Sequence, residues 1–102
     1  MKITKLDVPN DRIAAFCRKY GVKELSLFGS VLRDDFRPDS DVDVLLVFEP
    51  GSGVTFDNFL DIRDELSAIL GGRNVDVVEK RLLKNPYRRH EILTTREVVY
   101  AA

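Results

Sequence analysis

Apolar side chains recur every three or four residues in two stretches of the chain, which is the spacing of an amphipathic helix. The first stretch predicts a helix from about residue 11 to 20, closed by Gly21. The second predicts a helix over about residues 56–70, with Thr55 as its cap and Gly71-Gly72 at its end. Both helices carry an apolar stripe, so we expect them to pack on a sheet.

Runs of apolar and β-branched residues lie between and after these helices and predict strands. The predicted strands cover about residues 23–28, 41–48 and 74–78. Further on, Asn85-Pro86 combines a cap with a proline at the first helical position, which predicts a third, short helix through about Leu93. Residues 98–100 either add a terminal strand or pack as a tail.

These elements predict an α/β (α+β) fold. We expect a single small domain over residues 1–102, in which a mixed β-sheet has helices packed on one face and an open acidic active face. A chain of this length leaves no room for a second catalytic or substrate domain.

The composition suits a soluble globular domain. Hydrophobic residues make up 44% and charged residues 32% of the chain, which argues against disorder. The formal net charge is −1, so no global field draws the chain to nucleic acid. No apolar run approaches the roughly 20 residues of a membrane helix, and the first residues lead into no signal-peptide core, so we expect a cytoplasmic protein. The single Cys17 excludes an internal disulfide, and its place on the apolar stripe predicts core packing.

Two carboxylates open the strand predicted over residues 41–48. Because successive strand residues point to opposite faces, Asp41 and Asp43 share one face, about 6.6 Å apart along the strand. Neighbouring carboxylates repel each other, and a hard cation such as Mg²⁺ removes that conflict, since it takes carboxylate oxygens together with waters and substrate phosphates. Asp76 joins the same face if its strand is a neighbour.

Gly29 and Ser30 follow the strand predicted over residues 23–28 at a sharp turn. Glycine allows close backbone approach, and the serine adds a hydroxyl donor. If residues 30–33 begin a short helix, its free amide groups face whatever lies beside the carboxylates, and helix N-termini of this kind bind phosphate. Together with the carboxylates, this turn predicts a metal–nucleotide site.

This constellation resembles the nucleotidyltransferase superfamily that includes DNA polymerase β, and within it the minimal nucleotidyltransferase (MNT) proteins of prokaryotes. The family pattern is Gly-Ser followed at a fixed distance by Asp-x-Asp, with a third carboxylate on a later strand. It stands here as Gly29, Ser30, Asp41, Asp43 and Asp76.

The resemblance implies a role for each of these residues. Gly29 and Ser30 hold the β and γ phosphates of ATP, and Asp41 and Asp43 hold two Mg²⁺ ions. Asp76 binds the second of these metal ions and can take the proton of the acceptor.

Arginines near the site and basic residues near the C-terminal end leave alternatives open. Arg33 and Arg37 either form salt bridges within their loop or, as the resemblance suggests for Arg33, contact the nucleotide phosphates. The C-terminal group either forms a solvated face or binds an acidic partner, a nucleotide or RNA. Its members are Lys80, Arg81, Lys84, Arg88, Arg89 and Arg96.

The activity implied by the resemblance is transfer of AMP from ATP to a hydroxyl, with release of pyrophosphate. Stand-alone MNT proteins are often antitoxins partnered with a HEPN-type ribonuclease toxin, and family members attach AMP to a tyrosine of that toxin. We therefore expect a toxin-neutralising adenylyltransferase, a type VII-like antitoxin. Two alternatives remain: neutralisation by stoichiometric binding without catalysis, and transfer to RNA or a small molecule. The near-neutral charge counts against RNA.

Overall fold

The computed structural model describes residues 2–3, 6–32, 37, 40–53, 55 and 57–102. No helix in this part of the chain is both long and apolar enough to cross a membrane. The described elements, in chain order, are β1 (Lys2–Ile3), β2 (Leu6–Asp7), α1 (Asn10–Tyr20), β3 (Val22–Phe28), the 3₁₀ helix η1 (Gly29–Leu32), β4 (Val42–Phe48), α2 (Phe59–Ile69), β5 (Val75–Glu79), the 3₁₀ helix η2 (Lys80–Leu82), α3 (Pro86–Thr95) and β6 (Glu97–Ala101).

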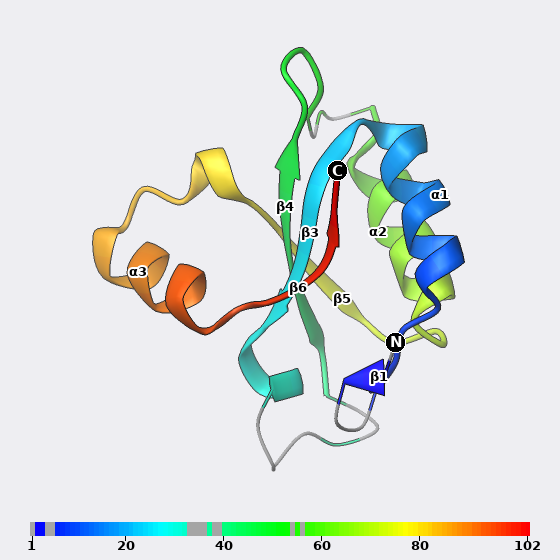
Figure 1. The fold of residues 1–102 in the computed structure, drawn as a ribbon, viewed down its shortest axis with the longest axis horizontal. Helices are drawn as coiled ribbons and strands as arrows, with labels where there is room; N and C mark the ends of the chain where they lie inside the picture. The colour runs from blue at the N-terminus through cyan, green and yellow to red at the C-terminus, as the bar shows by residue number, and fades with distance from the viewer. Residues whose placement is uncertain (1, 4–5, 33–36, 38–39, 54, 56) are drawn as a thin grey trace.

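A four-stranded mixed sheet forms the centre of the fold, with strand order β5-β4-β3-β6 (Figure 1). β4 pairs antiparallel with β3 and parallel with β5, and β6 runs antiparallel along the other edge of β3. The three strands predicted from the sequence are confirmed, with ends displaced by one residue. The segment at residues 98–100 belongs to a strand rather than a tail. The short antiparallel pair of β1 and β2 was not predicted.

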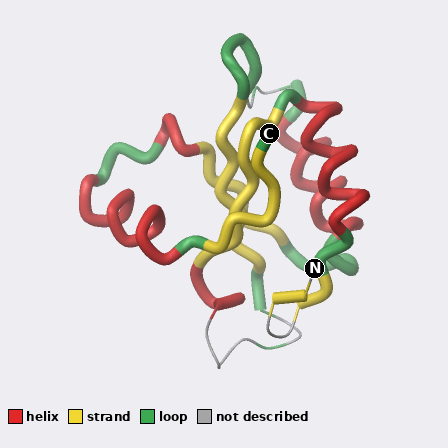
Figure 2. Tube along the Cα trace, viewed as in Figure 1, coloured by secondary structure: helices red, strands yellow, loops and turns green. Residues whose placement is uncertain are grey.

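Helices α1 and α2 cover one face of the sheet, as the red coils on one side of the strands in Figure 2 show. Alternate residues of β4 point into this layer, where the helix stripes meet them. The fully buried side chains of this core include Ile13, Cys17, Leu25, Leu27, Val42, Val44, Leu46, Ile62 and Leu66. The predicted helix ends are confirmed as well: Gly21 adopts a left-handed conformation after α1, and Gly71-Gly72 follow α2.

Helix α3 corrects the prediction that the helices pack on one face only. It lies on the opposite side of the sheet from α1 and α2 (Figure 1). Its buried Ile92 packs with Phe28 of β3, Leu45 of β4 and Leu83 in a second apolar cluster. The physical reason is that β4 is apolar on both faces beyond Asp43, so its second face also requires a cover. Helix α3 therefore covers part of the face that carries the acidic residues, and that face is open only where α3 does not cover it.

Helix α2 begins later than the sequence pattern suggested. It starts at Phe59, whereas the prediction began at residue 56, which lies outside the described residues. The expectation that Thr55 caps the helix is met in part. The residue that precedes the helix is Asn58, but the Asn58 amide donates to Thr55 Oγ1 at 3.3 Å and the Thr55 amide donates to Asn58 Oδ1 at 2.7 Å, which is the bonding of a capping box. This reciprocal pair closes the turn before the helix.

Cys17 lies on the buried side of α1 and is fully buried in the core, as predicted. Burial raises the pKa of its thiol from 9.0 to about 12, because the ionised sulfur would lose its hydration. The thiolate is the reactive form, so we expect the folded protein to resist the thiol reagent DTNB at pH 8, and the denatured chain to react fully.

The same pKa shift predicts how stability depends on pH. The unfolded chain releases the Cys17 proton near pH 9 while the folded chain keeps it up to about pH 12, so the free energy of unfolding falls as the pH rises through this window. Urea titrations at pH 8 and pH 10, compared with the same titrations of Cys17→Ala, measure this term. Rapid DTNB labelling under native conditions, or equal pH dependence of both proteins, would contradict the prediction.

Candidate active site

Strands β4 and β5 bring two of the predicted carboxylates together. Their parallel register pairs Asp43 with Asp76, and pairs the flanking Val42 with Val75 and Val44 with Val77. The flanking valines pack into the core of α1 and α2, so both aspartates lie on the opposite face, beside each other on strands about 4.8 Å apart. Asp43 is half-buried and Asp76 is exposed. The conditional expectation that Asp76 joins the acidic face is met, because the two strands are neighbours.

The Gly-Ser turn meets the same carboxylate from the other side. Phe28, the last residue of β3, is the register partner of Asp43, so the chain enters the turn directly beside it. Gly29 has a φ of +75°, and a Cβ placed on it would lie 2.3 Å from Asp43 Oδ2. The carboxylate therefore occupies the space that a side chain at position 29 would take. The two halves of the motif, 14 residues apart in the sequence, are in contact.

The short helix that the sequence analysis considered conditionally over residues 30–33 is present as the 3₁₀ helix η1 over Gly29–Leu32, which buries Val31 completely. Ser30 lies in this helix. The placement of its side chain, and of Arg33, falls outside the described part of the structure, so their predicted roles in nucleotide binding stay predictions.

Asp41 is the one predicted carboxylate that lies outside the paired strands. It precedes β4, which begins at Val42, so the strand pleat does not fix its direction. It is exposed and lines a small hollow together with Arg63, Asp64 and Ser67 of α2. Among the described residues, no three His, Cys, Asp or Glu side chains are arranged so that they could hold a metal ion. The metal role of Asp41 thus stays a prediction.

The pair that the structure does assemble fits the predicted metal. Mg²⁺ is commonly held by one or two carboxylates, with waters and substrate phosphates completing its coordination, and it needs no cage made only of protein groups. Asp43 and Asp76 would supply hard oxygen ligands from neighbouring strands. A Mg²⁺ ion held by them would take its other ligands from water or a substrate.

Helix α3 adds two charged side chains that the motif did not single out. Asn85 caps it, with Oδ1 accepting from the Tyr87 and Arg88 amides, and Pro86 takes the first helical position as predicted. Arg88 and Glu91 line the same hollow as Gly29. Sequence reasoning counted Arg88 only within the C-terminal basic group and gave Glu91 no role. Their spacing of three residues, which places them on one side of a helix, was the available signal.

The C-terminal basic group proves to be divided. Arg81 forms a salt bridge with the buried Glu79 of β5. Arg96 forms another with Glu24 of β3, in which Nη2 lies 3.6 Å from Oε1. These two arginines therefore have structural partners. Lys84 and Arg88 are exposed, which leaves them available to a ligand or a partner.

Comparisons with known proteins agree with this geometry. A family model described as a nucleotidyltransferase domain matches residues 12–99. The protein adenylyltransferase MntA of Thermococcus cleftensis is 39% identical over 82 residues, which are 80% of this chain and 77% of that protein.

Two solved structures share the fold. One is a crystal structure of a toxin–antitoxin complex with AMP-PNP, with a TM-score of 0.72 and 16% identity over 93% of this chain and 75% of that chain. The other contains a tri-AMPylated Shewanella oneidensis HEPN toxin in complex with an MNT antitoxin, with a TM-score of 0.63 and 17% identity over 91% of this chain and 70% of that chain. At these identities the two likenesses concern the fold alone.

Proposed function

The chain belongs to the nucleotidyltransferase domain family, and we propose that it transfers AMP from ATP to a tyrosine hydroxyl of a HEPN-type ribonuclease toxin, acting in the cytoplasm as the antitoxin of that toxin. The observation that carries the proposal is the position of Asp43: its carboxylate lies against Gly29, and Asp76 is its register partner on the neighbouring strand. Support for a protein acceptor comes from the relative named a protein adenylyltransferase and from the AMPylated HEPN toxin in a complex of the same fold.

In this proposal, separate residues of the chain bind the phosphates, hold the metal and accept the proton. The backbone at Gly29 and Ser30 binds the β and γ phosphates, and Asp41, Asp43 and Asp76 hold magnesium. When bound there, Mg²⁺ neutralises charge on the phosphates and activates the acceptor hydroxyl. Asp76 accepts the tyrosine proton while the tyrosine oxygen bonds to the α phosphorus. The bond from that phosphorus to the bridging oxygen breaks, and pyrophosphate leaves.

The test is the intact mass of a HEPN-type protein encoded beside this chain, after incubation with the protein, ATP and Mg²⁺. We expect the partner to gain whole AMP units, and peptide mapping to locate them on tyrosine. A stable complex without any mass gain would overturn the proposal in favour of neutralisation by binding alone. Transfer of label to RNA or a small molecule, with none to the partner, would replace the acceptor class.

A further inference from the structure

A cavity of about 670 Å³ lies between η1 and α3, on the face of the sheet that carries Asp43 and Asp76. Its apolar lining comes from Phe28 and Leu32 on one side and Ile92 of α3 on the other. Gly29 borders it, so the cavity opens next to the Asp43 carboxylate. Its volume is within the range of pockets that hold small organic ligands, and it is far larger than a metal ion or a phosphate needs.

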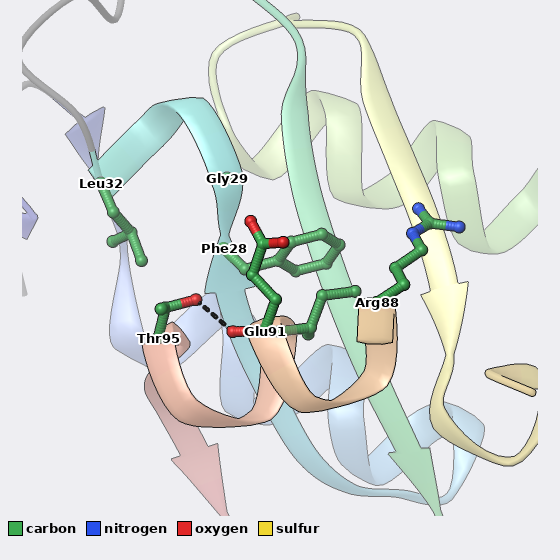
Figure 3. A pocket seen from close by; sticks show the side chains of 7 residues that line it. Phe28, Gly29, Leu32, Arg88, Glu91 and Thr95 are labelled. Carbon is green, nitrogen blue, oxygen red and sulfur yellow. Dashed lines mark hydrogen bonds between the residues drawn. The ribbon is translucent and has the colours of Figure 1, made fainter. Parts of the chain in front are cut away.

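Three polar side chains of α3 surround this apolar lining (Figure 3). The Glu91 side chain points toward the end of β3, where Phe28 and Gly29 lie, whereas Arg88 extends away from Gly29. The Thr95 hydroxyl donates to the Glu91 backbone oxygen at 2.7 Å, so it is tied to the helix, and its methyl group is left as part of the wall. A carboxylate facing the cavity disfavours phosphate there and favours groups that donate hydrogen bonds.

We propose that this cavity binds the nucleoside part of the nucleotide substrate. The base packs against Phe28, Leu32 and Ile92, and a donor group of the base or the ribose bonds the Glu91 carboxylate. This inference rests on the proposed function, because it takes the phosphates of the same nucleotide to lie at Gly29. It adds the site that recognises the nucleoside, which neither the sequence motif nor the carboxylate pair supplies.

The order of the strands favours the nucleoside over the acceptor as the occupant. Asp76, which would accept the proton of the acceptor, lies on β5, whereas the cavity borders the end of β3. Asp43 on β4 lies between them, because the sheet order is β5-β4-β3. The attacking and the leaving oxygen lie on opposite sides of the phosphorus in an in-line transfer. The acceptor therefore belongs on the β5 side, which leaves the cavity to the nucleotide.

The test compares two neighbouring residues of α3. Thr95→Trp places an indole in the cavity, whereas Thr94→Trp changes the adjacent residue, which is also exposed and does not line the cavity. Calorimetric titration with ATP and Mg²⁺ is expected to show about tenfold or greater weakening for Thr95→Trp, because the base loses its apolar contact, and little change for Thr94→Trp. Inorganic tripolyphosphate with Mg²⁺, which lacks the nucleoside, is expected to bind both variants equally.

Glu91→Ala is a second test variant, for which the affinities for ATP and for tripolyphosphate are expected to change differently. ATP binding is expected to weaken about tenfold through loss of a charged hydrogen bond, while tripolyphosphate binds no more weakly, because a repulsive carboxylate is gone. Equal ATP affinity for the two tryptophan variants, or parallel weakening of ATP and tripolyphosphate in Thr95→Trp, would overturn the proposal. Absence of AMP transfer to a partner, with this pattern of ATP binding intact, would count against the proposed function alone.

Discussion

Asp43→Asn is expected to lower the rate of AMP transfer about a thousandfold or more while the fold is retained. Asp43 is the carboxylate at which the elements of the site meet: it is half-buried, it contacts Gly29, and it is the register partner of Asp76. Charge neutralisation by a metal ion lowers the activation free energy of such a transfer by several kcal/mol. Each 1.4 kcal/mol corresponds to about tenfold in rate, so loss of the charged ligand is expected to cost about a thousandfold or more. Asparagine preserves the size of the side chain, so the packing against Gly29 remains.

Asp61→Asn is the matched control, because Asp61 is an exposed carboxylate on α2, across the sheet from the site. It is expected to keep the rate of the unmodified protein. Single-turnover mass spectrometry of the partner measures both variants, and circular dichroism with thermal melts checks their folding. Transfer by Asp43→Asn at the control rate would show that the proposed site is wrong.

The same variant also separates catalysis from binding. If Asp43→Asn still forms the complex and restores growth of cells that express the partner, neutralisation needs no AMP transfer. If it binds but growth stops, the chemistry is what protects the cell. The variant is suited to this question because it alters charge within the site and leaves α3, the exposed helix on that face, unchanged.

The sheet could be predicted because its strands are apolar runs bounded by turns, and local pattern is enough to define them. Even the pairing of Asp43 with Asp76 was foreseen conditionally, since alternation fixes the face of each residue once two strands are known to be neighbours. Which strands are neighbours is a tertiary fact. Local pattern also placed the start of α2 too early, because the apolar stripe does not show where the turn closed by Thr55 and Asn58 ends and the helix begins.

The face of the sheet that α3 covers could not be predicted from the sequence pattern, for a related reason. Leu45 alternates with Val44 and Leu46, so β4 reads as an apolar run on both faces, and nothing local states which helix covers which face. The cavity bordered by Glu91 depends on that choice. Conversely, Asp41 was predicted to share a face with Asp43, but it precedes the first paired residue of β4, where the alternation of the strand no longer applies.

Gly29→Ala is expected to reduce AMP transfer about a hundredfold, with only a modest loss of stability. The backbone at this position has a φ of +75°, a left-handed conformation that costs an alanine roughly 1–2 kcal/mol. A new Cβ would also lie 2.3 Å from Asp43 Oδ2 and 3.2 Å from Asp43 Cγ. The carboxylate is the far end of a short side chain, so we expect the carboxylate to move rather than the strand. A displacement of about 1 Å in a catalytic group can cost a hundredfold in rate.

Gly51→Ala separates the two effects, because Gly51 has a φ of +85° and a Cβ added there would meet nothing within 4 Å. It carries the same backbone penalty without touching the site. Urea titrations are expected to give both alanine variants similar losses of stability, whereas only Gly29→Ala loses transfer activity. Equal activity of the two variants would mean that the Asp43 carboxylate need not rest on Gly29 for catalysis. A large loss of activity only in Gly29→Ala would instead tie the absence of a Cβ at this glycine to the position of the carboxylate, and hence to the chemistry.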